Sequence, residues 1–298
     1  MKLHSTPRDL ILATLHGSEF ATVEPFVRSL NRTGYAGRTV FFTSQTSQAT
    51  QTALRRNGVD VVPFHFIGKR DRQPLAGLWP LWRRYFASGA SASAKRRLAH
   101  CVFHLRYRRY LLYAEFLQPR AADFDRVLLA DSRDVFFQAD PFSGQLPPGV
   151  HCVLEEPQVR LGHCPLHQRW LGCQFGPEFL AQHADETASC SGTTFGDTAG
   201  MLDYLAQMIS VSMQARSLAK ISGGDQGIHN FLLIEKRLKP VTLHPNRHGP
   251  VLTMGVMQPG EFQMSREGWA LNENGDVPPV LHQYDRLPEL KKHLLAGL

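Results

Sequence analysis

Two aspartates stand directly after a short apolar run near the middle of the chain. Residues 126–130 have the length and composition of a buried strand, and Asp131 and Asp134 follow it, three residues apart. At the end of a strand both carboxylates can turn toward one hard cation, which usually binds one or two carboxylates together with phosphate oxygens of a substrate. The alternative is a turn whose aspartates only accept hydrogen bonds from backbone N–H groups. The pattern favours a divalent-metal site for a phosphorylated substrate.

A second polar segment lies in the last third of the chain, where Gly223 and Gly224 precede Asp225 and Gln226. A pair of glycines lets the backbone approach a ligand closely. Asp225 is placed to open a helix with its side chain directed into a pocket. The alternative is an ordinary helix N-cap, a position that aspartate favours. In the presence of the first motif, this segment favours a catalytic or substrate-binding role.

Together the two motifs resemble the GT-A glycosyltransferases, nucleotide-diphospho-sugar transferases of the glycogenin and lipopolysaccharide galactosyltransferase type. Asp131-Ser-Arg-Asp134 is similar to their Asp-x-Asp motif with one residue inserted, and Asp225-Gln226 begins a match to their Asp-Gln-x-x-x-Asn helix start. The resemblance implies that Asp131 and Asp134 hold Mn²⁺ or Mg²⁺ against the diphosphate of a sugar nucleotide. The inserted residue leaves open which aspartate binds the metal directly. Asp225 and Gln226 are implied beside the donor sugar and the acceptor hydroxyl.

The same resemblance assigns roles to residues outside the two motifs. His282 follows two apolar residues late in the chain and is implied as a further metal ligand. Neutral imidazole suits Mn²⁺ better than Mg²⁺. Ser191 and Gly192 resemble the Cys-Ser-Gly turn that borders the acceptor pocket, and Gly223 and Gly224 also belong to the acceptor side. The residues expected to bind the nucleotide or its diphosphate, at strand ends or through positive charge, are Thr14, Leu15, His16, Arg106, Arg109, Asp131, Ser132 and Arg133.

The elements that must position these residues alternate between strands and helices. The hydrophobic pattern predicts strands at 10–15, 38–43, 59–64 and 126–130, and helices at 19–31, 47–56, 95–118 and from residue 288 onward. Strands joined by helices over short connections are typical of a parallel sheet. We therefore expect an α/β fold with a mostly parallel central sheet flanked by helices, and the resemblance makes this the Rossmann-like GT-A fold. A single domain, 1–298, has a nucleotide-binding half, 1–134, and an acceptor-side half, 135–298.

Positive charge is concentrated in one part of the chain. The formal net charge is +7, but residues 66–109 contain eleven basic residues and one acidic residue. Residues 66–95 have the character of an insertion, with a loop-like run at 88–94. With Trp79 and Trp82 among its arginines, this insertion is expected to meet an acidic acceptor or an anionic membrane surface. The alternatives are a solvated basic face and a lid over the diphosphate.

Composition and missing motifs disfavour several classes of protein. An apolar content of 43% excludes a disordered chain, and no apolar run approaches the ~18 residues of a membrane span. Residues 10–15 are too short for a secretory signal, so we expect a cytoplasmic protein, with a peripheral position at the inner membrane face as an alternative. Five cysteines argue against a disulfide-built domain. A zinc site is the alternative for His163, Cys164, His167 and Cys173. These four residues lack the second ligand pair at the spacing of a structural zinc site.

The sequence predicts a metal-dependent glycosyltransferase that moves a sugar from a UDP-sugar to a glycan, lipid or protein acceptor, with retention of configuration. No phosphate-binding loop of an ATPase and no dinucleotide-binding glycine motif is present. One alternative is a nucleotidyltransferase of related fold. Another is a non-catalytic protein that binds nucleic acid or an anionic surface, which would explain the basic segment, including its arginines alternating with aromatic side chains at 106–110. We expect no nucleic-acid partner.

Overall fold

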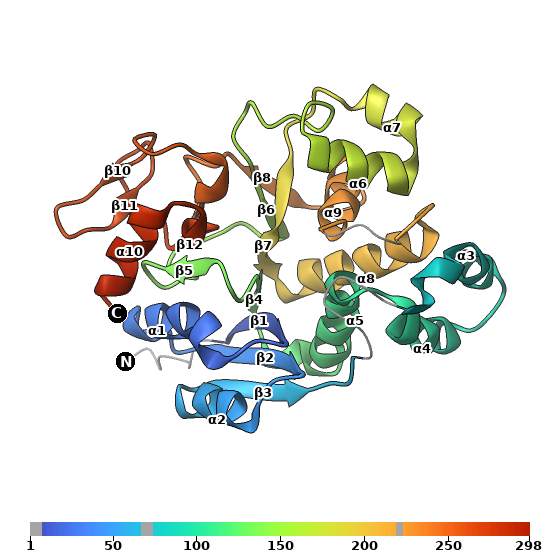
Figure 1. Ribbon diagram of the computed structural model, residues 1–298, viewed down its shortest axis with the longest axis horizontal. Helices are drawn as coiled ribbons and strands as arrows, with labels where there is room; N and C mark the ends of the chain where they lie inside the picture. Colours follow the sequence, from blue (N-terminus) through green and yellow to red (C-terminus); the bar gives the residue numbers. More distant parts are fainter. Residues whose placement is uncertain (1–7, 67–73, 219–222) are drawn as a thin grey trace.

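A seven-stranded sheet runs through the middle of the protein, with helices on both faces (Figure 1). The computed structural model describes residues 8–66, 74–218 and 223–298. The strands are β1 (Asp9–His16), β2 (Arg38–Ser44), β3 (Val59–Pro63), β4 (Arg126–Ala130), β6 (Val150–Leu154), β7 (Ser189–Asp197) and β8 (Val241–His244). They lie in the order β3-β2-β1-β4-β7-β6-β8, and neighbours are parallel except that β7 is antiparallel to β4 and β6. The expected α/β fold with a mostly parallel sheet is confirmed.

Proline and capping residues explain where two of the helices begin. They are α1 (Glu24–Arg32), α2 (Gln48–Arg56), α3 (Trp79–Ala87), α4 (Ala92–Val102), α5 (Leu105–Leu117), α6 (Pro165–Phe175), α7 (Pro177–Gln182), α8 (Thr198–Gln214), α9 (Asp225–Ile234) and α10 (Pro288–Ala296). Helix α1 begins later than predicted because Pro25, in its first turn, has no N–H to donate to an earlier turn. Ser47 caps α2 by accepting a hydrogen bond from the Thr50 N–H at 3.2 Å. Within the described part of the chain, no helix has both the length and the apolar character needed to cross a lipid bilayer.

Two hydrophobic cores lie on opposite faces of the sheet, and β1 contributes to both. Leu10 and Leu12 join the core beneath α5, α8 and α9. Ile11 and Ala13 point the other way, into the core that contains α1 and α2. All four side chains are fully buried. The alternation follows from the two-residue period of a strand and explains why residues 10–15 form an unbroken apolar run.

The predicted helix at 95–118 is wrong, because the chain forms two helices there instead of one. Phe103 and His104 have extended backbone angles, and this break separates α4 from α5. The break lets the fully buried Phe103 ring pack against Trp79 and Phe86, at centroid distances of 6.2 and 6.0 Å. The loop predicted at 88–94 is shorter than expected, because Ser91 caps α4 and the helix already begins at residue 92.

A smaller three-stranded sheet follows the two aspartates. Strand β5 (Val135–Phe137) pairs antiparallel with β12 (Val280–His282), which pairs in parallel with β9 (Val251–Thr253). Alternate side chains of this sheet enter the second core and a third core that contains α10. A short hairpin of β10 (Gln263–Met264) and β11 (Ala270–Leu271) lies in the same C-terminal part (Figure 1). The small sheet brings the end of β12 to the loop that follows β4.

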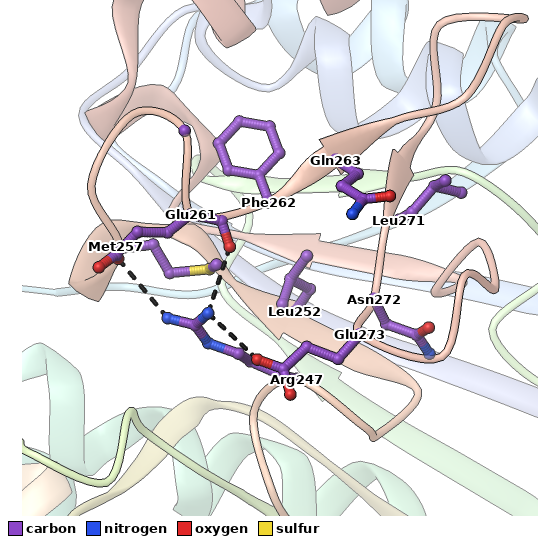
Figure 2. A pocket seen from close by; sticks show the side chains of 10 residues that line it. Arg247, Leu252, Met257, Glu261, Phe262, Gln263, Leu271, Asn272 and Glu273 are labelled. Atoms are coloured by element: carbon purple, nitrogen blue, oxygen red, sulfur yellow. Dashed lines mark hydrogen bonds and ion pairs between the residues drawn. The ribbon is translucent and has the colours of Figure 1, made fainter.

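A buried ion pair connects the large sheet to this C-terminal part. Glu156, two residues beyond β6, is almost fully buried and accepts hydrogen bonds from Arg247 at 2.8 Å and from Asn246 at 2.8 Å. Arg247 stands at the rim of a hollow of about 230 Å³, where it also pairs with Glu261 and Glu273 (Figure 2). Because three glutamates already neutralise Arg247, the hollow is not a prepared anion site.

Replacing Arg247 should therefore destabilise the fold. In Arg247→Met the buried Glu156 carboxylate loses its cation, and we expect the free energy of unfolding to fall by about 2–4 kcal/mol. Urea denaturation monitored by circular dichroism measures this change. Arg28→Met is the matched control, because among the described residues Arg28 pairs with the partly exposed Glu24 on α1 alone, and its loss should cost about 0.5 kcal/mol or less. Equal losses in the two variants would contradict a structural role for the Glu156–Arg247 pair.

Candidate metal and substrate site

The predicted site residues lie at the carboxyl edge of the large sheet. Strand β1 lies between β2 and β4. The strand order therefore reverses at β1, because β2 and β3 are added on one side of it and β4 on the other. Parallel sheets bind ligands in the crevice beyond the strand ends where the order reverses in this way. His16 ends β1, and Asp131 directly follows β4. The fold therefore places both predicted segments at the position where such a sheet binds ligands.

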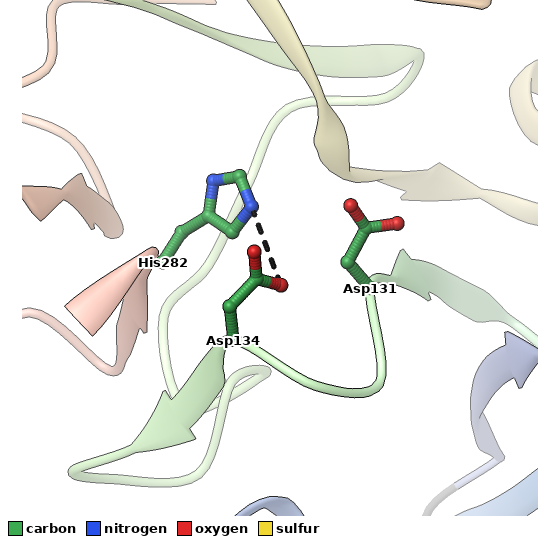
Figure 3. Close-up of side chains that lie close together, drawn as sticks. All are labelled: Asp131, Asp134 and His282. Carbon is green, nitrogen blue, oxygen red and sulfur yellow. Dashed lines mark ion pairs between the residues drawn. The ribbon is translucent and has the colours of Figure 1, made fainter. Parts of the chain in front are cut away.

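Asp131, Asp134 and His282 converge at this edge (Figure 3). Each offers one ligand atom, and the three atoms lie within 4.8 Å of one another. Asp134 immediately precedes β5 and His282 ends β12; the strand register places His282 opposite Val135. Within residues 8–66, 74–218 and 223–298, no second group of three such side chains converges, and His163, Cys164, His167 and Cys173 do not form one. The predicted metal-ligating residues are thus brought together from segments far apart in the sequence.

The surroundings of His282 fit a metal ion. Its ring is buried, and Nε2 has no hydrogen-bond partner among the described residues, although Asp134 Oδ1 lies 4.0 Å away. Its other nitrogen, Nδ1, lies 3.7 Å from Cys190 Sγ, within hydrogen-bonding distance for sulfur. A buried nitrogen without a partner is costly in a folded protein. Two carboxylates and an imidazole nitrogen form a ligand set that suits Mn²⁺ and, less well, Mg²⁺.

Gly192 leaves open the space between these ligands. Strand β7 bulges here, because Cys190 and Thr194 face the consecutive residues Val153 and Cys152 of β6, leaving residues 191–193 out of that ladder. The bulge brings the Gly192 carbonyl to the Asp131 N–H at 2.8 Å. A Cβ on Gly192 would collide with His282 Nε2 and would lie 3.1 Å from Asp131 Oδ2. The glycine that was predicted on the acceptor side therefore borders the metal-ligand cluster itself.

Arg109 joins the two predicted motifs. Its guanidinium pairs with Asp131 through one nitrogen and with Asp225 through the other at 2.7 Å. Burial by itself would raise the pKa of Asp131, but the positive charge of Arg109, followed by those of His282 and Arg106, outweighs it. The pKa of Asp131 therefore lies below its usual range. The predicted diphosphate-binding arginines of α5 are thus near the predicted metal, and Arg109 contacts one of its ligands.

Asp134 has the opposite electrostatic environment. Burial raises the pKa of its carboxyl above the usual range; His282 opposes this shift, and the negative charges of Asp131 and Asp285 reinforce it. No arginine pairs with Asp134 among the described residues. The ionised Asp134 is therefore short of positive charge, as expected for a carboxylate that binds a cation.

Asp225 and Gln226 begin α9 but face different groups. Asp225 is not an N-cap: it is almost fully buried, and its carboxylate accepts hydrogen bonds from Arg109 and, at 3.3 Å, from the Tyr110 hydroxyl. Gln226 Nε2 donates to Glu155 Oε1 at 2.8 Å and lies 2.9 Å from His167 Nε2. Asp225 thus fixes Arg109 beside the predicted metal ligand Asp131, and Gln226 fixes Glu155 and His167.

Glu155 is a site residue that the sequence analysis missed. It directly follows β6, just as Asp131 follows β4, so the same pattern of an acid after an apolar strand could have identified it. Burial raises the pKa of Glu155, and the hydrogen bond from Gln226 offsets only part of the effect. Burial lowers the pKa of His167 to about 4, so its ring is neutral and can accept the Gln226 N–H.

The remaining predicted residues are distributed around the cluster. Ser132 donates a hydrogen bond from its hydroxyl to the Thr14 carbonyl at 2.8 Å, which connects the ends of β4 and β1. The Leu15 side chain is buried in the core, whereas His16 packs edge-on against Phe66. The other predicted residues occupy three settings: Arg133 is exposed, Ser191 lies in the β7 bulge, and Gly223 and Gly224 precede α9.

Comparison with known proteins assigns neither a family nor a function to this chain. No protein-family model matches the chain, and comparison with curated proteins also gives no match. A mixed α/β sheet hosts many unrelated activities, so function has to be argued from the site. The nucleic-acid-binding alternative loses one of the observations in its favour, because the Tyr107 and Tyr110 rings are buried and cannot serve as a stacking platform for bases.

The two aspartates should respond oppositely to neutralisation in metal-free protein. A raised pKa means that Asp134 contributes stability only below its ordinary pKa and loses it as the pH rises through the folded value. A lowered pKa means that Asp131 contributes stability above its ordinary pKa and loses it as the pH falls through the folded value. At neutral pH with chelator, Asp134→Asn should raise Tm and Asp131→Asn should lower it. Thermal unfolding across the acidic range checks this, and both differences should shrink as the wild-type carboxyls protonate. Shifts of the same sign would contradict the described electrostatics.

Gly192→Ala should impair metal binding without removing a ligand. The added methyl group displaces His282 Nε2, so we expect Mn²⁺ affinity to fall by about tenfold or more. Isothermal titration calorimetry measures the affinity. Gly172→Ala is the matched control, because its Cβ would lie in helix α6 at an ordinary 3.9 Å from Leu180. Unchanged Mn²⁺ affinity in Gly192→Ala would show that Gly192 does not border the metal site.

Proposed function

We propose that this protein is a divalent-metal-dependent glycosyltransferase of the GT-A type, which transfers a sugar from a nucleotide-diphosphate sugar. A UDP-sugar is the expected donor, and a glycan, lipid or protein is the expected acceptor. The supporting observation is the convergence of Asp131, Asp134 and His282 at the carboxyl edge of a mostly parallel sheet, beside the reversal of strand order. His282 Nε2, which has no hydrogen-bond partner among the described residues, supports the assignment of His282 as a metal ligand.

The charges of the site support a cation and, with it, a phosphorylated substrate. Asp131, Asp134 and Asp225 contribute three carboxylates, and Arg109 pairs with two of them. The excess negative charge favours Mn²⁺ or Mg²⁺ and would repel a diphosphate in its absence. Such a cation, when bound, would neutralise the charge that develops on the nucleoside diphosphate as it leaves.

The protein's own side chains would orient the reactants. Arg109 fixes the Asp131 and Asp225 carboxylates relative to each other, and Arg106 adds positive charge near the diphosphate. Ser132 holds the metal-binding loop to the end of β1, where the nucleotide is expected. We assign Asp225 and Gln226 to the sugar and the acceptor hydroxyl, with retention of configuration favoured by the resemblance of this segment.

The test combines donor screening with one substitution. Thermal-shift measurements with UDP-, GDP- and CMP-sugars and Mn²⁺ identify the donor, and release of the nucleotide product measures transfer or donor hydrolysis. Asp134→Asn should abolish both the Mn²⁺-dependent gain in Tm and product release, while the metal-free fold survives. Asp125→Asn is the control, because Asp125 is an exposed aspartate at the opposite end of β4. This variant should keep both the Mn²⁺-dependent gain in Tm and product release.

Two results would overturn the proposal. Full activity in Asp134→Asn, or in wild-type protein with excess chelator, would exclude the metal-dependent mechanism. Release of pyrophosphate when the protein is given a nucleoside triphosphate and a sugar phosphate, with no nucleoside diphosphate released from the sugar nucleotides, would identify a nucleotidyltransferase, which shares the metal and diphosphate chemistry but breaks a different bond.

A further inference from the structure

Exposed apolar side chains gather on one short stretch of the surface. Seven large apolar side chains are exposed among the described residues, and four of them lie between residues 75 and 85. The four are Leu75 at 40%, Leu78 at 45%, Leu81 at 58% and Tyr85 at 38% exposure. They belong to the 3₁₀ helix η2 (Pro74–Leu78) and to α3, which lie at the end of the molecule away from α10 (Figure 1). A concentration of this kind on a water-facing helix indicates an interaction surface.

The geometry of α3 explains why these side chains face outward. Its inner side is already used: Trp79 and Phe86 are buried against Phe103, and the Trp79 indole donates to the Ala215 carbonyl at 2.9 Å. Leu78, Leu81 and Tyr85 follow one another at spacings of three and four residues, so they share the opposite side. The helix is therefore apolar on both sides, and packing within the protein accounts for only one of them.

The same surface is strongly basic. Residues 74–102 contain five lysines and arginines and no aspartate or glutamate. Arg84, three residues after Leu81, is exposed beside the apolar side chains, whereas Arg83 is exposed on another side of α3 and Arg97 is exposed on α4. Basic side chains beside exposed leucines match a surface that is negatively charged outside and apolar inside. An anionic lipid bilayer has both properties.

We infer that this surface docks the protein on an anionic lipid bilayer. The docking face consists of Leu75, Leu78, Leu81, Arg84 and Tyr85, and Arg83 adds positive charge from a neighbouring side of α3. Its leucines enter the boundary between headgroups and acyl chains, while the two arginines contact lipid phosphates. Nucleic acid is a poorer partner, because three of the four apolar groups are aliphatic and bases stack on aromatic rings. This inference uses no residue of the metal site and does not depend on the proposed activity.

The experiment is co-sedimentation of the whole protein with vesicles of phosphatidylglycerol and phosphatidylcholine in equal parts. We expect binding to these vesicles and little binding to vesicles of phosphatidylcholine alone. Arg83→Gln with Arg84→Gln should weaken binding by about fivefold for each charge removed and reduce its dependence on salt. Leu78→Gln with Leu81→Gln should weaken binding at high salt as well, because insertion of apolar side chains is not screened.

The matched control replaces two leucines of nearly equal exposure elsewhere. Leu166 and Leu243 are 57% and 45% exposed, so Leu166→Gln with Leu243→Gln removes the same apolar area from other surfaces. This control should bind as the wild type does, and all variants should keep the wild-type Tm. Equal loss in the control, or equal binding to neutral vesicles, would overturn the inference. So would tight binding of a mixed-sequence single-stranded RNA that the arginine variant loses and the leucine variant retains.

Discussion

Arg109 holds together the sheet edge on which the candidate site is built. Its buried guanidinium pairs with Asp131, after β4, and with Asp225, at the start of α9, so one cation fixes three elements relative to one another. The Asp225 carboxylate, which is 3% exposed, could not be buried at this depth without a compensating charge. The cost of burying the arginine is in turn offset by two carboxylates and by the Tyr110 hydroxyl. The geometry of the site therefore depends on charge balance as much as on packing.

The balance is incomplete at Asp134 and His282, and this is where a metal fits. The β7 bulge brings Gly192 beside His282 and Asp131 without filling the space between them, and the register of β12 on β5 places His282 opposite Val135, the residue after Asp134. A raised carboxyl pKa and a buried nitrogen without a partner are unfavourable in the absence of a ligand. Functional sites commonly retain such local costs, because binding of the ligand removes them.

The basic segment is divided by the fold into parts with different surroundings. Arg109 is directed into the site, whereas Arg108 lies over the Phe64 and Phe66 rings, with its guanidinium carbon 5.5 and 5.6 Å from their centroids. The arginines of α3 remain on the surface beside exposed leucines. The break at residues 103–104 makes this division possible, because a continuous helix would have kept α4 and α5 on one axis. The net charge of the basic segment therefore sums residues that have unrelated roles in the folded protein.

Local patterns in the sequence were enough to predict the strands at 10–15, 38–43, 59–64 and 126–130, because alternation, apolar runs and caps act between near neighbours. The strand-end position of Asp131 and Asp134 followed from the same patterns. Other features depend on contacts between distant segments: the break at Phe103 follows from burial against Trp79 and Phe86, and the carboxylate of Glu155 meets Gln226 only after β6 and α9 have packed. Strand register places His282 opposite Val135, next to Asp134 in the chain, and hydrophobic pattern and packing determine that register jointly. The sequence by itself determined which residues could bind a metal, and the tertiary structure decided which of them meet, because only folding brings side chains from distant segments into one electrostatic environment.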